Sequence, residues 1–562
     1  MHFQDLKPSW VAKRTSTPFL SSRVLGERLG SHIAARSVPC ILHEHGQLLA
    51  AAFCRNGPMT QFSRGKKMQG VKVKFVINVA GALIGIGIAL LTIPLYISTI
   101  GEERYGILSL VFIMLGYLGF LDFGLCQAST QALAKMHDAS ANERGSVFVT
   151  SLWSNVFLGS LGGMIIYFAG GYILFTTHGL SDTLRAEIQG AMPWIAPILP
   201  LSMASGISIG ALESRERFFA SNVIQILSNM LGQILPLLTA LFISPSLTTV
   251  IPAILAVRAL TAIATLMFVV VSEQLHRFTL FDLRRAKSLF QFGIWVALTN
   301  IISPLMGSIG QFVIANMMGP SFVARFAVPM TAAMRLQIFN AALGRTVFPR
   351  FSRFDREEAS ALAVKSSVAI AYLSAMLFAP GLVVVHPFFD FWMGKNFAID
   401  AAPVASVLFI GAWFNGLAFI PEMLLLGQKR PDQLAKLHVA EILPYIGALW
   451  FLIHQLGLTG AAVAWTLRAF VDALVLFRLA HLPMRGLLPA VPALVGTIVG
   501  LVFGFVIPGW PPVAILAFAS ALALSIGVFG LFIVPELREI FLNILKILRQ
   551  KSLAMKELNA KK

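Results

Sequence analysis

Several arginines lie within stretches that are apolar and long enough to cross a membrane, and three of them are candidates for chemistry: Arg258, Arg325 and Arg335. A charge near the middle of a spanning helix costs about 2.5–3.5 kcal/mol on insertion scales, so it usually faces a bundle interior or an aqueous cavity. Arginine suits phosphate groups because its planar guanidinium donates two parallel hydrogen bonds and keeps its charge. These arginines are therefore candidates for binding an anionic group inside the membrane.

Two of these arginines have clear structural alternatives. Arg325 lies a few residues from the predicted outer end of its span, where its long side chain could reach the membrane surface. Arg335 lies ten residues before Arg345. That spacing is about 15 Å along a helix, which places Arg335 near the bilayer midplane. At this depth, pairing with a buried acid is the main alternative to ligand binding.

Acidic side chains also lie within apolar stretches, at Asp122, Glu422 and Glu441. Asp122 is near a predicted cytoplasmic helix end, where a simple polar contact is the structural alternative to a functional role. Glu422 and Glu441 could carry protons in H⁺ or Na⁺ coupling, or could pair with buried arginines. Arg468 precedes Asp472 by one helical turn, so we expect those two charges to neutralise each other. No metal site and no cofactor beyond such ion coupling is predicted.

The elements that position these residues are membrane-spanning helices. Of the 562 residues, 57% are hydrophobic and 12% are charged, a composition typical of a polytopic membrane protein. The net charge of +18 fits basic cytoplasmic loops and does not require nucleic-acid binding. Fourteen apolar runs are long enough to span. They lie near residues 74–98, 105–130, 146–172, 190–212, 219–243, 249–271, 289–317, 321–345, 363–389, 400–427, 433–455, 458–480, 486–507 and 512–534.

Loop charges set the predicted orientation. One set of alternate loops carries most of the arginines and lysines between spans, whereas the other set carries Arg104, Arg185 and Lys395. The basic set is predicted to be cytoplasmic. Both termini then lie in the cytoplasm.

The spans are predicted to form two six-helix bundles around a central cavity, with two further helices at the C-terminal end. A glycine turn at Gly101 returns in similar form at Gly319 and Gly457, which suggests internal repetition. The predicted parts are a basic leader (1–67), an N-terminal bundle (68–275), a basic linker (276–288), a C-terminal bundle (289–485), helices 13 and 14 (486–535) and a basic amphipathic tail (536–562). Met68 is expected to be the natural start, and the alternative is that residues 1–67 form a mostly disordered cytosolic arm.

Several local sequences resemble one family. Pro94-Leu95-Tyr96, Gly101 to Gly106, Gly119 to Leu125, Phe348 to Phe351, Met393 to Ala398 and Gly457 to Trp465 are similar, in order and placement, to the polysaccharide-transporter family of oligosaccharide flippases. That family belongs to the multidrug/oligosaccharidyl-lipid/polysaccharide exporter (MOP) superfamily. The resemblance covers nearly all of residues 70–480.

The resemblance implies a function and a substrate. The expected substrate is a sugar repeat unit on a polyprenyl pyrophosphate, carried from the cytoplasmic to the outer leaflet of the bacterial inner membrane for O-antigen, exopolysaccharide or capsule assembly. Candidate partners are membrane lipids, a polysaccharide polymerase and a chain-length regulator. Uncharged polar side chains within the spans could line a sugar path or join helices: Asn78, Gln127, Asn300, Gln311, Gln337 and Asn340.

Two other functions are alternatives to flipping. A multidrug exporter of the same superfamily, coupled to Na⁺ or H⁺, would need an acidic cavity for organic cations, whereas the charges expected here are arginines. A membrane enzyme acting on lipid-linked sugars would need a large outside loop or a cytosolic domain with catalytic residues. The longest predicted outside loop, around residues 177–189, is too short for this. The chain is therefore predicted not to be an enzyme.

The predicted topology can be tested with reporter fusions. Fusions after Gly101, Ser181 and Lys395 should report the outside, and fusions after Ala141, Phe281, Asp355 and Asp432 should report the cytoplasm, because loop charge alternates between these positions. One reproducible reversal would contradict the predicted number of spans.

Overall fold

The computed structural model of the protein describes residues 85, 87–136, 139–177, 180–272, 281–283, 286, 309–351, 353–428, 430–506, 509–535, 538 and 542. The predictions for the leader, for most of the 276–288 linker and for most of the tail lie outside these residues. Within the described residues every regular element is a helix. The predicted all-α membrane fold is confirmed.

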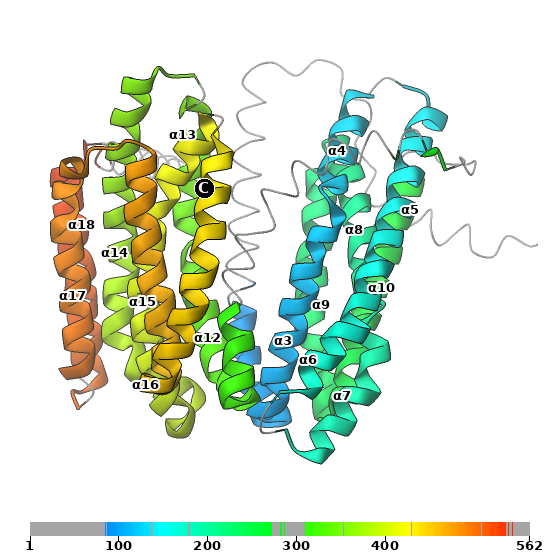
Figure 1. The fold of residues 1–562 in the computed structure, drawn as a ribbon, viewed down its shortest axis with the longest axis horizontal. Helices are drawn as coiled ribbons and strands as arrows, with labels where there is room; N and C mark the ends of the chain where they lie inside the picture. Colours follow the sequence, from blue (N-terminus) through cyan, green and yellow to red (C-terminus); the bar gives the residue numbers. More distant parts are fainter. Residues whose placement is uncertain are drawn as a thin grey trace, which may run out of the picture. The chain divides into compact units, whose positions relative to one another are not determined.

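Helices in the first half follow the predicted spans (Figure 1). They are Gly87–Ile100, α3 (Glu102–Leu118), η1 (Gly119–Asp122), α4 (Leu125–Lys135), α5 (Ala141–Ile165), η2 (Ile166–Gly170), α6 (Gly171–Phe175), α7 (Asp182–Ile195), α8 (Ile198–Ser214), α9 (Phe218–Phe242) and α10 (Leu247–Ser272).

The second half continues the same pattern. Its helices are Ile309–Met318, α12 (Pro320–Leu336), α13 (Ile338–Phe351), α14 (Arg356–Met393), α15 (Lys395–Gly427), α16 (Pro431–Leu479), η3 (Met484–Ala490), α17 (Val491–Val506) and α18 (Pro512–Ile533). Among the described residues, nine helical segments are long and apolar enough to cross a membrane. The chain is a multi-pass membrane protein.

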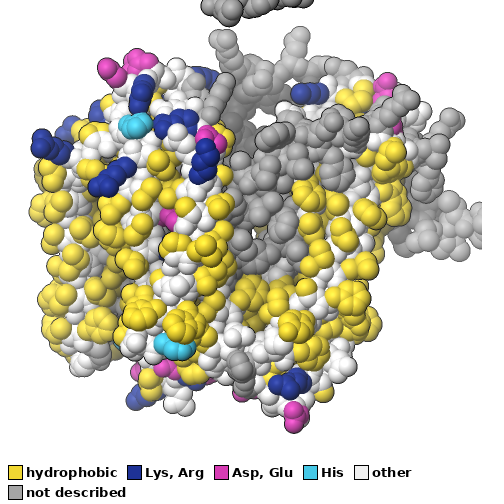
Figure 2. Space-filling model, viewed as in Figure 1, with side chains coloured by type: hydrophobic (Ala, Val, Ile, Leu, Met, Phe, Trp, Pro, Cys, Tyr) yellow, Lys and Arg dark blue, Asp and Glu magenta, His cyan; other side chains and the backbone are white. Residues whose placement is uncertain are grey.

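Apolar side chains cover the flanks of these helices. Figure 2 shows hydrophobic side chains along the length of the helices, while most charged side chains gather toward their ends. Phe532 and Val513 on α18 are 81% and 78% exposed. Such exposure of large apolar groups is costly in water and favourable in lipid, so these faces are suited to the bilayer core.

Glycines with left-handed backbone conformations make four short connections. Gly101, Gly319 and Gly394 have φ values of 84°, 99° and 83°, and each is the single residue between two helices. Gly457, with φ 59° and ψ −139°, breaks α16 into two helices at the boundary predicted between the eleventh and twelfth spans. Residues other than glycine rarely adopt a positive φ, so glycine is the residue that these connections require. The glycine turn that repeats in the sequence is therefore explained by the positive φ that the backbone adopts at each of these positions.

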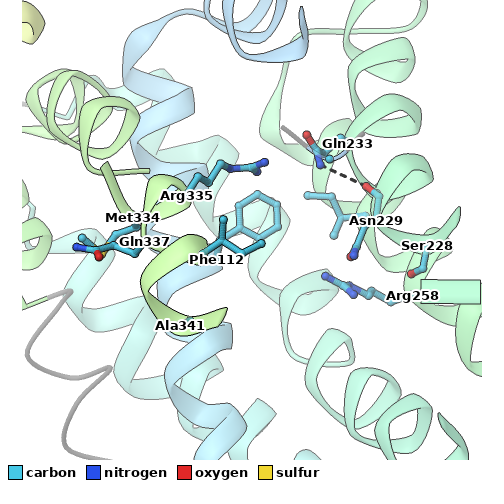
Figure 3. A pocket seen from close by; sticks show the side chains of 13 residues that line it. Phe112, Ser228, Asn229, Gln233, Arg258, Met334, Arg335, Gln337 and Ala341 are labelled. Carbon is cyan, nitrogen blue, oxygen red and sulfur yellow. Dashed lines mark hydrogen bonds between the residues drawn. The ribbon is translucent and has the colours of Figure 1, made fainter. Parts of the chain in front are cut away.

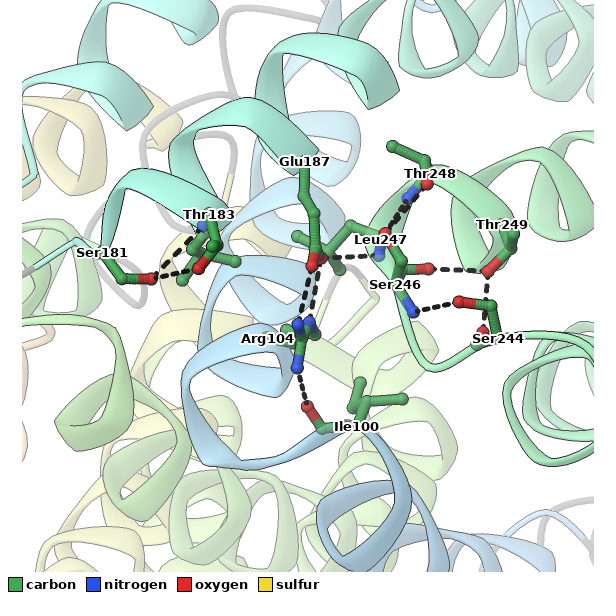
Figure 4. Close-up of polar contacts among 11 residues, drawn as sticks. Ile100, Arg104, Ser181, Thr183, Glu187, Ser244, Ser246, Leu247, Thr248 and Thr249 are labelled. Carbon is green, nitrogen blue, oxygen red and sulfur yellow. Dashed lines mark hydrogen bonds and ion pairs between the residues drawn. The ribbon is translucent and has the colours of Figure 1, made fainter.

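Polar contacts join helices of the first half at the predicted outer end (Figure 4). Arg104 on α3 donates to Glu187 on α7 from Nη2 at 2.6 Å and from Nε at 2.8 Å. The same carboxylate accepts from the backbone N–H of Leu247 at 3.0 Å, at the start of α10. One bidentate ion pair thus joins three helices.

The opposite end of this half is held by Arg144, whose side chain is buried. Its Nη1 donates to the carbonyls of Leu133 at 2.7 Å and Met136 at 2.9 Å, at the end of α4. Carbonyls in the last turn of a helix lack the intrahelical partners of interior carbonyls, so the arginine helps to satisfy this helix end. The Met136 carbonyl also accepts from the backbone N–H of Ala139 at 3.1 Å. Arg144 belongs to α5, and its contacts therefore fix the α4–α5 connection.

The two halves touch closely at the predicted outer end. A Cβ added to Gly106 on α3 would lie 1.8 Å from the carbonyl oxygen of Pro320, so the backbones of α3 and α12 are in direct contact. Arg325 on α12 donates to Glu102 on α3 at 2.6 Å and also pairs with Asp400 on α15. Backbone packing between α3 and α12 and the ion pairs of Arg325 therefore hold the helices together at this end.

Replacing Arg325 with alanine should lower stability, because Glu102 and Asp400 then face the same space without a cation. The three side chains are partly exposed, so the expected loss is modest, about 1 kcal/mol. The melting temperature of the purified protein in detergent measures the effect, and Arg185→Ala, at an exposed position on α7, is the matched control.

Adding Glu102→Gln to the Arg325→Ala protein should restore part of the melting temperature, since it removes one of the two facing charges. An Arg325→Ala protein that melts like the Arg185→Ala control would show that these ion pairs do not stabilise the closed end.

Candidate functional site

A cavity of about 670 Å³ lies among helices from both halves. α3 contributes Phe112, and α12 contributes Met334 and Arg335 (Figure 3). α9 contributes Ser228, Asn229, Gly232 and Gln233; α10 contributes Ile254 and Arg258; and Gly85, Gln337, Ile338 and Ala341 complete the lining. This volume is within the usual range of ligand pockets.

Two of the three predicted arginines meet in this cavity. Arg258 and Arg335 are both half-buried and both line it, although they belong to helices from different halves of the chain. In the described part of the chain, neither guanidinium has an ion pair or a hydrogen bond. Partly buried cations without acidic partners are costly unless water or an anion compensates them. The cavity is therefore suited to an anionic ligand.

The α9 side of the cavity is polar and uncharged. Asn229 and Gln233 are one helical turn apart and so share a face. The Gln233 side-chain amide makes two contacts at the 3.5 Å limit, accepting from Thr92 and donating to the Asn229 carbonyl. The Ser228 hydroxyl is bonded to Thr261 at 2.8 Å. Among the described residues of this wall, the Asn229 amide and the Gln233 amide, whose contacts are long and weak, are thus the polar groups best suited to rearrange onto a ligand.

Arg325 does not line the cavity. It lies at the predicted outer end, where Glu102 and Asp400 compensate its charge. Its role in binding a ligand stays a prediction, and its described contacts join α12 to α3 and α15.

Asp122 lies at the break between α3 and α4. The chain there passes through Phe123 and Gly124, both with positive φ. The Asp122 carboxylate accepts from the Cys126 backbone N–H at 3.1 Å and from Asn155 Nδ2 on α5 at 2.6 Å. These contacts satisfy a free N–H at the start of α4. The described environment is that of a helix-end polar contact.

Glu422 and Glu441 belong to a buried polar cluster in α15 and α16. Glu441 pairs with Arg468 at 3.5 Å, and Asp472 lies 3.9 Å from His438 Nε2. Arg468 thus forms its ion pair with Glu441, and it also interacts electrostatically with Asp472, one turn away, as the spacing predicts. Glu422 lies near Asp472. One oxygen each of Glu441 and Asp472 is buried without a hydrogen-bond partner.

The sequence analysis did not single out Phe112, Asn229 or Gln233. The two amides carried a usable signal, because two polar groups one turn apart in an apolar span mark a face that avoids lipid. Nothing in the sequence marked Phe112 as a site residue, because an isolated phenylalanine in a spanning helix normally contacts lipid or neighbouring helices. Gln337, which the sequence placed among candidate polar residues, does line the cavity.

Residues 71–355 match the family described as "Polysaccharide biosynthesis protein". A protein of Shigella flexneri named "Putative O-antigen transporter" is 28% identical over 409 residues, which are 71% of this chain and 95% of that protein. The matched family region contains Phe112, Arg258 and Arg335.

Solved structures show the same fold at low sequence identity. The lipid II flippase MurJ in an inward closed conformation superposes with a TM-score of 0.65 at 13% identity, covering 84% of this chain and 99% of that one. An inward-facing multidrug resistance MATE family transporter of the MOP superfamily gives a TM-score of 0.54 at 15% identity, covering 72% and 98%. The chain belongs to the polysaccharide biosynthesis protein family and has the helical fold of MOP-superfamily transporters.

Proposed function

We propose that this protein is a flippase that carries oligosaccharide repeat units, linked to polyprenyl pyrophosphate, from the cytoplasmic to the outer leaflet of the bacterial inner membrane. The repeat units would serve O-antigen, exopolysaccharide or capsule assembly, where a polymerase and a chain-length regulator would use them. The observation that carries the proposal is the cavity with two arginines that lack acidic partners among the described residues. The resemblance to an O-antigen transporter supports the substrate class.

The pyrophosphate explains why two arginines face one cavity. It presents several acceptor oxygens and more than one negative charge, and each guanidinium can bind two oxygens at once. A hydrogen bond to a charged group is worth about 1.5–3 kcal/mol. Binding of the headgroup by Arg258 and Arg335 would also hold the two halves of the protein against the same ligand.

The contacts at the predicted outer end support a transport cycle with alternating access. In the described conformation α3 and α12 touch at Gly106 and Pro320, and Arg325 pairs across the same end with Glu102. Release to the outer leaflet requires these contacts to separate. In the proposed cycle the outer end opens while the cytoplasmic end closes. Both termini lie in the cytoplasm in this proposal.

Ion coupling, if the cycle uses it, is best placed at the α15–α16 cluster. Among the described residues of this cluster, three carboxylates, Glu422, Glu441 and Asp472, accompany one arginine, Arg468, and one histidine, His438, which is charged only when protonated. Carboxylates in excess of cations inside a membrane can take up H⁺ or Na⁺ to reduce the cost of burial. We propose this cluster as the coupling site.

A multidrug exporter for organic cations is the alternative within the same fold. Its cavity would need acidic side chains to attract a cation, and among the described residues that line this cavity the charged ones are Arg258 and Arg335. The charge of the cavity therefore favours an anionic substrate.

Arg335→Gln and Arg258→Gln should each weaken binding of a polyprenyl pyrophosphate by about 10- to 100-fold, because each removes charge-assisted hydrogen bonds. Arg335→Lys should lose less, since it keeps the charge but not the bidentate geometry. Affinity can be measured with purified protein in lipid nanodiscs. In cells, the Gln variants should accumulate lipid-linked repeat units in the cytoplasmic leaflet.

Protein abundance in the membrane separates a binding defect from a folding defect. It should stay near normal in the Gln variants, because neither arginine has a described partner that its loss would leave unpaired. Arg185→Gln, at an exposed position outside the cavity, is the matched control. Normal affinity and normal export in both Arg258→Gln and Arg335→Gln would refute the proposed function.

A further inference from the structure

Phe112 is an unusual member of the cavity wall. It lies on α3, its side chain is 43% exposed, and in the view of Figure 3 its ring lies between Arg335 and Arg258. Within the described part of the chain, its ring stacks on no other aromatic ring or cation. Many other exposed phenylalanines here can face lipid, whereas this one faces a cavity that contains two charges. Its exposed ring is therefore accessible to a ligand that enters the cavity.

A sugar ring has the chemistry that such a wall would bind. One face of a pyranose carries a patch of C–H groups, which packs against the negative face of an aromatic ring. The rim of the same sugar carries hydroxyls, which need donors and acceptors. Asn229 and Gln233 offer both from α9, and each amide has a donor and an acceptor group. The apolar ring and the amides thus match the two sides of one sugar.

The positions of the arginines indicate which sugar this would be. The cavity volume of about 670 Å³ is that of a site for a drug-sized ligand. A space of this size encloses a pyrophosphate and the sugar next to it, but not a long oligosaccharide. With the pyrophosphate on Arg258 and Arg335, the first sugar of the repeat unit falls beside Phe112.

We infer that Phe112 is the stacking surface for the sugar attached directly to the pyrophosphate, and that Asn229 and Gln233 hydrogen-bond its hydroxyls. This inference rests on the proposed function. It makes the protein selective for a lipid that already carries a sugar over the bare polyprenyl pyrophosphate. The bare lipid is what remains once the sugars have been transferred, so this selectivity would disfavour its return through the same cavity.

The test compares two probes in lipid nanodiscs containing the full-length protein: a polyprenyl pyrophosphate without sugar, and the same lipid carrying one N-acetylhexosamine. The unchanged protein should bind the sugar-bearing probe about five- to tenfold more tightly, the value expected for one stacking contact. Phe112→Leu should abolish this preference while leaving affinity for the sugar-free probe within about twofold. Phe112→Trp should retain the preference because it keeps an aromatic face.

Phe157→Leu is the matched control, since Phe157 on α5 is 70% exposed and does not line the cavity. The inference is overturned if the unchanged protein does not distinguish the probes, if Phe112→Leu keeps the preference, or if Phe112→Leu weakens both probes equally. The arginine variants report separately on the proposed function, because Arg335→Gln should weaken both probes. Loss of sugar preference alone and loss of pyrophosphate binding are thus distinct results.

Discussion

The cost of holding a charge inside a membrane accounts for the arrangement of arginines in this protein. Arg325 is compensated by Glu102 and Asp400, Arg468 by Glu441, and Arg144 by the carbonyls that end α4. Each of these contacts also joins helices, so the same interaction that neutralises a charge positions an element. Among the described residues, Arg258 and Arg335 differ from these, because what faces them is a cavity. Arginines that could bind a ligand can thus be distinguished from arginines whose charge is already balanced by partners within the protein.

Close backbone contact makes this arrangement firm. At Gly106, α3 meets Pro320 with no room for a side chain, and at Gly163 and Gly500 an added Cβ would likewise lie 2.4 Å from the carbonyl oxygens of Ala196 and Ala379. In lipid, where apolar surface gives helices no reason to associate, such contacts provide much of the attraction. The contacts at Gly163 and Gly500 join helices of the same half, whereas the contact at Gly106 joins the two halves. The weaker, partly exposed ion pairs at Arg325 are then better suited to separating than the glycine contacts within one half.

Much of the fold could be predicted from the sequence, because length, hydropathy and loop charge act locally. The spans, the break at Gly457 and the repeated glycine turns all follow from such signals. The partner of each charged side chain could not be predicted, because it depends on contacts between residues that are distant in the sequence. Glu102 and Arg325, for example, are 223 positions apart. Arg468 likewise forms its ion pair with Glu441, on the other side of the break at Gly457, in addition to its electrostatic interaction with the neighbouring Asp472. Depth in the membrane identified Arg335 as a candidate, but nothing local distinguished Phe112 from the other members of a chain with 44 phenylalanines.

The one-residue turns have a consequence for the polar backbone that the helix ends expose. At Gly101, Gly319 and Gly394 a single glycine joins two helices, so each connection adds only one residue outside regular structure. Backbone groups outside regular structure need partners other than those of a helix, and a one-residue turn keeps their number small. A residue with a side chain would strain such a turn, because it would have to adopt a positive φ. The shortness of these connections therefore depends on glycine at each of the three positions.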